Sequence, residues 1–335
     1  MTSSFQAPQA CYSLFGLRVL SEVQLDEPRF EPAAGAAAIR IRRASLGHLS
    51  SASTDKVSLS LAGGDALLEV REVARYLVRA GEEILVDEKP GAYPGSVELF
   101  LLGSAFGILL HQRGMLPLHA NVIDVGGHGI AFAGPSGAGK STIASLFHDR
   151  GFSVLADDVC AVGFDMDGVP LAQPGPSRLK LWGDALRWSG RDPEEYRPVL
   201  DRTDKFIVPL PPALAPAEIP LTHVYVLGRA EGPDPSIRRL VGVEAMRALV
   251  SNTYRGEYLP YLKCEQRHFA DCLRLVKAVD VFEFNRPWRK DRFEEQVNEI
   301  CNHLRGRKAL ADQALLPSAF RMNTPAETAR SRATR

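Results

Sequence analysis

Between residues 12 and 90 the chain carries apolar side chains at alternate positions, in short runs. A Gly63-Gly64-Asp65 turn separates two of these runs, which lie at 14–19, 39–41, 57–61 and 84–86. Alternation with a period of two places the apolar side chains on one face of a strand. The pattern predicts a β-rich N-terminal module over residues 1–95, which would serve substrate recognition or assembly.

From residue 96 the apolar spacing becomes helical. Residues 96–112 predict a buried helix, whose continuous apolar run is too short to span a bilayer. From Leu118 onward strands and helices alternate as in an α/β domain, with strands expected at 129–133, 152–156, 223–227 and 279–284 and helices at 243–252 and 291–304. We therefore expect one α/β unit over 96–310, followed by a polar, disordered tail over 311–335.

Composition narrows the class of protein. The 335 residues include 40 basic and 40 acidic side chains, which leaves the chain neutral, and no basic block interleaves with aromatic residues. This balance disfavours nucleic acid as a partner. The 5 cysteines form no paired Cys-x-x-Cys signature and predict reduced, structural thiols. The first residues lack a basic leader and an apolar signal core, so we expect a cytoplasmic protein with no membrane partner.

The most specific motif is a glycine-rich loop between a buried strand and an amphipathic helix. Its glycines let backbone N–H groups turn toward phosphate oxygens at the positive end of the helix. Lys140 would neutralise the outer phosphates, and Ser141 would ligate Mg²⁺. The sequence predicts a site for ATP and Mg²⁺ made by Gly134, Pro135, Ser136, Gly137, Ala138, Gly139, Lys140, Ser141 and Thr142.

Two adjacent carboxylates follow the next predicted strand. Asp157 and Asp158 end the strand 152–156, one helix and one return strand after the loop, at the edge where open α/β sheets place ligands. Asp157 would hold Mg²⁺ and Asp158 would accept a proton from an incoming hydroxyl. The alternative for Asp158 is a turn residue that only caps the strand end. His119 precedes the loop by fifteen residues and, taken alone, is more often a core histidine than a catalytic one.

Together, His119, the loop and the Ala-Asp-Asp strand end resemble the catalytic half of the HPr kinase/phosphorylase family, over roughly residues 112–184. The resemblance implies an α/β phosphate-loop core of the HPr kinase C-terminal type that phosphorylates serine hydroxyls. It also implies that His119, Lys140 and Asp158 are active-site groups and that Ser141 binds Mg²⁺. The chain departs from the family at Thr142, where an acidic residue is usual. Residues 175–182 also lack the family's Mg²⁺-binding glutamate, so the reverse phosphorolytic reaction is not expected.

Residues 12–17, 178–182 and 204–206 resemble a narrower group, the HPr-kinase-related proteins of bacterial peptide gene clusters. That group includes kinases that modify the C-terminal serine of lasso peptide precursors, which implies a precursor peptide as the substrate. Arg178 and Lys205 are candidates for contacts to phosphate or to a peptide carboxylate. The alternative for both is an ordinary solvated side chain.

Three functions remain open at this stage. The first is a kinase for the C-terminal serine of a precursor peptide. The second is a kinase for an HPr-like protein or for a small hydroxylated metabolite such as free serine, which would share every catalytic residue. The third is a regulatory protein that binds ATP without transferring phosphate, although such a protein needs no base. HPr kinases assemble into rings, so a homo-oligomer is among the expectations.

Overall fold

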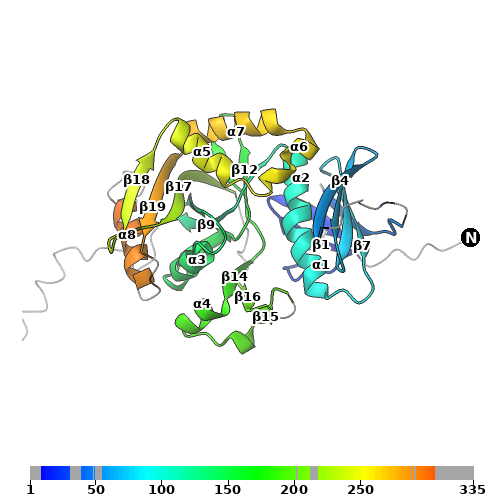
Figure 1. Ribbon diagram of the computed structural model, residues 1–335, viewed down its shortest axis with the longest axis horizontal. Coiled ribbons are helices and arrows are strands. Elements are labelled where there is room, and N and C mark those ends of the chain that lie inside the picture. The colour runs from blue at the N-terminus through cyan, green and yellow to red at the C-terminus, as the bar shows by residue number, and fades with distance from the viewer. Residues whose placement is uncertain are drawn as a thin grey trace, which may run out of the picture.

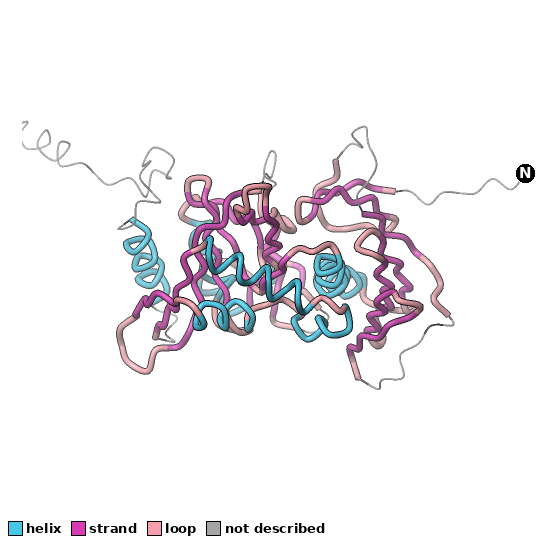
Figure 2. Tube along the Cα trace, turned by 90° about the horizontal axis from the view of Figure 1, so that it is seen from above, coloured by secondary structure: helices cyan, strands magenta, loops and turns pink. Residues whose placement is uncertain are grey.

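The computed structural model describes residues 9–30, 39–47, 49, 55–200, 203–211, 218–287, 289 and 292–305. These residues form a mixed α/β fold, as predicted, in which a buried helix lies between two large sheets (Figure 1). The view from above shows the same order of layers (Figure 2). The predicted tail over 311–335 lies outside the described residues.

The alternating positions of the N-terminal region form a seven-stranded sheet, which confirms the predicted β-rich character. Its strands run in the order β1-β2-β3-β7-β6-β5-β4. The predicted turn at 63–65 joins two antiparallel strands. The strands are β1 (Ala10–Leu14), β2 (Leu17–Ser21), β3 (Ile39–Arg43), β4 (Val57–Ala62), β5 (Asp65–Val70), β6 (Ala74–Arg79) and β7 (Glu83–Glu88).

The predicted helix at 96–112 is confirmed as the element between the two sheets. It comprises α1 (Pro94–Phe100), a π-helical segment η1 (Leu101–Ala105) and α2 (Phe106–Gln112). By length and composition Pro94–Gln112 could cross a membrane, but 83% of its apolar window is buried inside the protein. Its side chains pack with those of the seven-stranded sheet and with Tyr254. The helix is therefore a core element shared between the two halves.

A nine-stranded sheet forms the second half. Strands follow the order β11-β9-β10-β17-β13-β12-β8, and β19 and then β18 lie beside β17. The central strands β10, β17 and β19 are parallel to one another. The strands are β8 (Leu116–Leu118), β9 (Ala120–Val125), β10 (His128–Ala133), β11 (Ser153–Ala156), β12 (Cys160–Phe164), β13 (Pro170–Ala172), β17 (Ile219–Arg229), β18 (Ser236–Leu240) and β19 (Asp280–Arg286).

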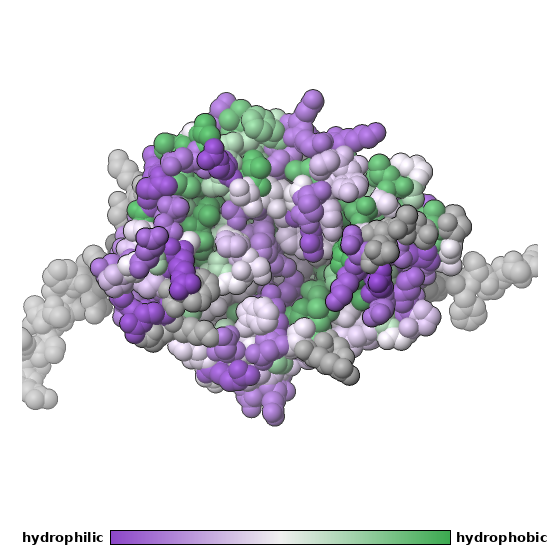
Figure 3. All heavy atoms as spheres, viewed as in Figure 1, coloured by the Kyte–Doolittle hydropathy of each residue, from purple (hydrophilic) through white to green (hydrophobic). Residues whose placement is uncertain are grey.

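Helices cover both faces of this sheet because each face carries its own apolar cluster. On one face pack α3 (Lys140–Asp149) and α8 (Phe293–Arg305), and on the other pack α5 (Val243–Ser251) and α7 (Glu265–Ala278). A small sheet completes the fold and consists of β14 (Arg178–Trp182), β15 (Arg197–Pro198) and β16 (Lys205–Pro209). The short elements α4 (Gly183–Trp188) and η2 (Pro193–Glu195) connect β14 to β15. Two further short elements, η3 (Gly256–Tyr258) and α6 (Leu259–Leu262), connect α5 to α7. The face drawn in Figure 3 is largely hydrophilic, with hydrophobic residues in scattered groups.

Strand register brings three predicted site segments to one edge of the nine-stranded sheet. Antiparallel pairing sets Ala120 opposite Ala133, so the residue before β9 lies level with the residue after β10. Ala156, the last residue of β11, is paired with Val122 of the same strand. His119, the 134–142 loop and the Asp157-Asp158 pair therefore meet at the carboxyl ends of β10 and β11.

Candidate active site

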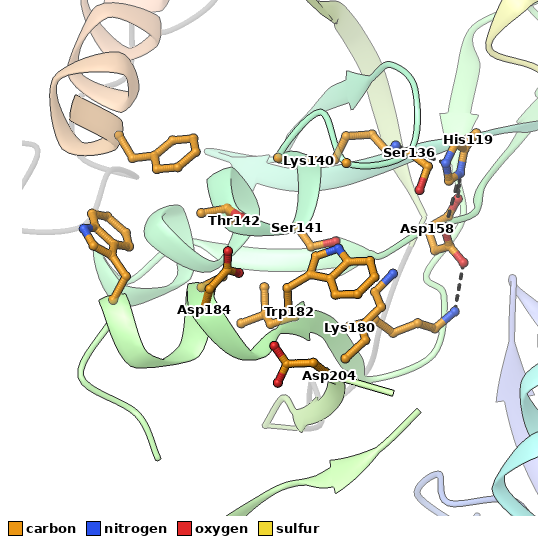
Figure 4. Close-up of a pocket in the computed structure, with 17 residues that line it drawn as sticks. His119, Ser136, Lys140, Ser141, Thr142, Asp158, Lys180, Trp182, Asp184 and Asp204 are labelled. Atoms are coloured by element: carbon orange, nitrogen blue, oxygen red, sulfur yellow. Dashed lines mark hydrogen bonds and ion pairs between the residues drawn. The ribbon is translucent and has the colours of Figure 1, made fainter. Parts of the chain in front are cut away.

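A cavity of about 400 Å³ lies beside the 134–142 loop. The loop and the first residues of α3 form one wall, and β14, α4 and the start of β16 form the opposite wall (Figure 4). His119 and Asp158 lie together at one end, as the labelled side chains show. Residues from five different elements therefore converge on one polar space.

The loop conformation depends on its glycines. Gly134, Gly137 and Gly139 have φ values of 140°, 80° and 79°, which favour residues without a Cβ atom. A Cβ on Gly139 would lie 2.6 Å from Nη2 of Arg286. Gly139 is the N-cap residue of α3 and has no side chain that could accept hydrogen bonds from the first N–H groups of the helix. These N–H groups can therefore bind a ligand at the positive end of the helix.

A buried arginine supports the loop from behind. Arg286, fully buried at the end of β19, donates from Nη2 to the carbonyl of Ala138 and from Nη1 to Oε1 of Gln296 at 2.8 Å. Burial lowers the pKa of Arg286 to about 10. The hydrogen bond holds the Ala138 carbonyl toward Arg286. The carbonyl oxygen therefore does not point at the phosphates of a ligand in the cavity, which it would repel.

Lys140 is held by three acceptors at the start of α3. Its Nζ donates to the carbonyls of Gly134 and Pro135, at 2.8 and 3.1 Å, and to Nε2 of His119 at 3.0 Å. Burial lowers the pKa of Lys140 to about 8, against the opposing effect of Asp158 and Asp157. The ammonium is thus fixed at the cavity and only partly compensated by charge.

His119 has a defined tautomer because its two ring nitrogens face different groups. Nδ1 lies 3.0 Å from the carbonyl oxygen of Asp158, an acceptor, so Nδ1 carries the proton. Nε2 accepts from Lys140. Burial and then the charge of Lys140 lower the pKa of His119. A neutral His119 therefore connects Lys140 to the Asp158 segment and acts as a positioning residue.

Asp158 presents a carboxylate that is ionised and firmly held. Its Oδ2 accepts from Nζ of Lys180 at 2.9 Å, and its Oδ1 lies 3.3 Å from Nδ1 of His119 (Figure 4). Burial alone would raise the pKa of Asp158, but the charge and hydrogen bond of Lys180 bring it well below the usual range. The backbone has a φ of 73°, which costs energy for a residue with a side chain. Such strain is common at functional sites.

Asp157 lies behind the cavity wall and organises its neighbours. Its Oδ1 accepts from Oγ of Ser141 at 2.9 Å and from Nδ2 of Asn121 at 2.7 Å, and its Oδ2 accepts from the backbone N–H of Lys180 at 2.7 Å. Burial raises the pKa of Asp157. The prediction that Asp157 holds Mg²⁺ directly or through water stays a prediction: its carboxylate does not line the cavity, whereas Ser141 does.

The two basic candidates from sequence have different positions. Lys205 lines the cavity, with Nζ 5.7 Å from the ring centre of Trp182. Arg178 does not line it and is buried, with Nη1 2.8 Å from Oε1 of Glu98 and Nε 3.4 Å from Oε1 of Glu27. The structure therefore places Arg178, predicted to contact phosphate or a peptide carboxylate, beside internal carboxylates and not at this cavity.

Sequence reasoning missed Lys180, Asn121 and the aromatic side chains of the cavity. Alternation along β14 was the available signal: Leu179 and Leu181 enter the core, so Lys180 and Trp182 point to the opposite side. Nothing in the sequence marked Asn121, whose role comes from its place beside β11. Trp182, Trp188 and Phe293 line the same cavity. Figure 4 shows Trp182 on the wall formed by β14, beside Lys180.

The fold and the site define an α/β protein with a glycine-rich strand–loop–helix unit beside a polar cavity. Among the described residues, no group of three or more His, Cys, Asp or Glu side chains could hold a metal ion alone.

No protein-family model matches the chain, and no curated protein matches it. Among solved structures the chain is similar to the structure of the Hpr(Ser) kinase/phosphatase from Coxiella burnetii. The match has 14% sequence identity and a TM-score of 0.29, and it covers 57% of this chain and 93% of that chain. A TM-score of this size does not establish a shared fold.

Proposed function

We propose that this protein is an ATP-dependent kinase that transfers the γ-phosphoryl group to a serine hydroxyl. The observation that carries the proposal is the position of Asp158, a fixed carboxylate beside the glycine-rich loop and within the same cavity. A protein that only binds nucleotide does not need such a group. A kinase needs a carboxylate that orients the acceptor hydroxyl and takes its proton.

The cavity has the features that a nucleotide requires. Backbone N–H groups of the loop and of the first turn of α3 would bind the phosphates, and Lys140 would exchange a carbonyl partner for a phosphate oxygen. Trp182 and Trp188, which also line the cavity, would offer aromatic surfaces for the base. The volume of about 400 Å³ is within the range of ligand pockets.

The residues also fit one Mg²⁺ ion of the kind that accompanies ATP. Mg²⁺ in such sites takes one or two protein oxygens, phosphate oxygens and several waters. Ser141 would contribute its hydroxyl, oriented by its hydrogen bond to Asp157, and Asp157 would act directly or through water. The ion would neutralise charge on the phosphates when bound.

Transfer would then proceed by direct displacement. The serine oxygen forms a bond to the γ-phosphorus, the bond to the bridging oxygen of ADP breaks, and the hydroxyl proton passes to Asp158. Lys140 stabilises charge on the transferring group. His119 hydrogen-bonds to both Lys140 and the carbonyl of Asp158, and so holds the two residues at a fixed distance from each other. Most of the rate enhancement comes from positioning and electrostatics.

The acceptor we favour is the C-terminal serine of a precursor peptide, of the lasso type that the sequence resemblance implies. The test incubates the purified protein with Mg·ATP and either a peptide ending in serine, an HPr-like protein or free serine, and measures product mass. We expect a mass gain of one phosphoryl group on one acceptor, and none with Lys140→Ala. Tight binding of ATP without product from any hydroxyl would favour the regulatory alternative.

A further inference from the structure

A second cavity meets the nucleotide cavity at its reactive end. It has a volume of about 630 Å³. His119, Ser136 and Asp158 line both cavities, so the Asp158 carboxylate lies between them. The rest of its lining comes from two segments: Gly134 and Pro135 at the start of the glycine-rich loop, and the end of α5 with the loop that follows it, which contribute Ser251, Asn252, Thr253, Tyr254, Arg255 and Glu257. A hydroxyl entering through the second cavity would reach Asp158 without crossing the nucleotide cavity, which leaves it free to approach the γ-phosphorus opposite the leaving group.

Arg255 is the positively charged side chain that this loop presents. Its guanidinium lies 5.5 Å from the ring centre of Tyr254 and 5.8 Å from that of Tyr258, which fixes its plane. Among the described residues its guanidinium forms a 3.4 Å ion pair with Glu257, whose side chain is 61% exposed. Buried Nε of Arg255 has no hydrogen-bond partner in the described part of the chain. The charge is therefore weakly compensated.

The other ionisable groups of this cavity do not duplicate that charge. His119 is neutral for the reasons given above, and Asp158 is paired with Lys180. Glu257 lies at the solvent side. Arg255 is therefore the charged group of this cavity that could bind an anionic ligand, and it lies in the same cavity as the Asp158 carboxylate.

Backbone strain marks the same place. Arg255 has a φ of 54° and Asp158 a φ of 73°, both in the left-handed region, and both line this cavity. Non-glycine residues in that region cost about 1–3 kcal/mol and persist where the surrounding structure requires them. Backbone hydrogen bonds from the N–H of His119 to the carbonyl of Asn252 and from the N–H of Tyr254 to the carbonyl of Pro117 anchor the loop to the segment around β8 just before Arg255.

We infer that the second cavity is the acceptor subsite and that Arg255 binds a carboxylate carried by the acceptor close to its hydroxyl. Arginine suits this role because its planar fork binds a carboxylate through two parallel hydrogen bonds. The inference rests on the proposed function for the direction of phosphate transfer. Two sources present this chemistry, a free hydroxy amino acid and a peptide whose last residue is serine.

The test measures binding by calorimetry to the full-length protein loaded with Mg²⁺ and a non-hydrolysable ATP analogue. The probes are L-serine, serinamide, a short peptide ending in serine and the same peptide with an amidated end. We expect at least one carboxylate-bearing probe to bind about 10- to 100-fold more tightly than its amide, the size of a charge-assisted hydrogen bond. Equal binding of acid and amide, or no binding of any probe, would overturn the inference.

Variants assign the effect to the residue. Arg255→Gln should remove the difference between acid and amide while the affinity for the ATP analogue stays unchanged, and Arg255→Lys should restore part of it. Arg247→Gln, at an exposed position on α5, is the matched control and should change nothing. Retention of the full acid preference in Arg255→Gln would contradict the assignment.

Glu257 distinguishes the two sources. A free amino acid also carries an ammonium group, which Glu257 could bind, whereas a peptide end does not. Glu257→Gln should weaken L-serine and leave the peptide unchanged if the acceptor is a free amino acid. Acid-selective binding without phosphate transfer to any probe would count against the kinase proposal but leave this carboxylate site in place.

Discussion

At the scale of one residue, the protonation of Lys140 should make the affinity for Mg·ATP depend on pH. Burial lowers its pKa to about 8, so in the free protein the ammonium loses its proton as the pH rises through that value. Bound phosphates favour the charged form. Affinity for Mg·ATP should therefore fall above about pH 8, by up to about tenfold for each pH unit.

Calorimetry at about pH 7 and about pH 9, in two buffers with different heats of ionisation, measures both the affinity and the proton taken up. Lys140→Arg keeps its charge throughout this range, so the variant should lose the pH dependence. An affinity that is the same at both pH values in the wild type would contradict the role of Lys140.

At the same scale, the sequence predicted His119, Lys140, Ser141 and Asp158, and the structure brings them together. Local motifs sufficed for the loop and the strand end because each is a contiguous pattern with a known geometry. Lys180 was not predicted because its role depends on a contact across 22 positions, to Asp158. Arg178, a predicted site residue on the same strand, lies beside the buried carboxylates of Glu98 and Glu27.

At the scale of elements, the strand–loop–helix unit depends on Gly139. Alanine there would meet Arg286 and would also adopt a positive φ. Gly139→Ala should raise the Kd for Mg·ATP by about 5- to 150-fold, since backbone strain and a displaced Arg286 together cost about 1–3 kcal/mol. Equilibrium binding measures this effect.

Gly127 provides the matched control for that experiment. It lies in the turn between β9 and β10 with a φ of 83°, and a Cβ there would meet nothing within 4 Å. Gly127→Ala shares the backbone strain without the steric contact, and its Kd should equal that of the wild type. Equal losses of ATP affinity in both variants would show that the loop geometry at Gly139 is not specific.

The elements that the sequence did not predict are those whose partners are distant. The helix α7 and the small sheet of β14, β15 and β16 are examples, because α7 buries two polar side chains, His268 and Asp271, and the strands of the small sheet are only two to five residues long. The strands of the N-terminal region and the helix at 94–112 were predicted because their periodicity is regular. The order of the strands in either sheet does not follow from such patterns.

At the scale of the whole molecule, Arg178 joins the N-terminal half to the small sheet. Its partners Glu27 and Glu98 come from the segment after β2 and from α1, and the side chains of all three are at most 7% exposed. Arg178→Met should lower the free energy of unfolding by about 3–5 kcal/mol, since two buried carboxylates lose their counter-charge. Urea denaturation measures the loss.

The same variant should show a characteristic pH dependence. Burial already raises the pKa of Glu27 to about 6, against the effect of Arg178, and removal of Arg178 would raise it further. A carboxyl whose pKa is raised on folding stabilises the fold below its unfolded pKa, and that stability is lost as the pH rises through the folded value. Arg178→Met should therefore lose less stability near pH 5 than near pH 8.

Arg42→Met is the control for both experiments. Arg42 also lies near two carboxylates, Glu22 and Glu83, but its side chain is 55% exposed. Its loss should change the unfolding free energy by less than about 1 kcal/mol. A similar stability for the Arg178 and Arg42 variants would contradict the structural role assigned to Arg178.

Single-turnover transfer by Asp158→Asn tests the central claim most directly. Asparagine tolerates the left-handed backbone at this position, so the loop geometry should be retained. With an acceptor that the wild type phosphorylates, the variant should bind Mg·ATP with about wild-type affinity and transfer phosphate about 100- to 10,000-fold more slowly. Transfer at the wild-type rate would contradict the account, because Asp158 would then not be the group that receives the hydroxyl proton.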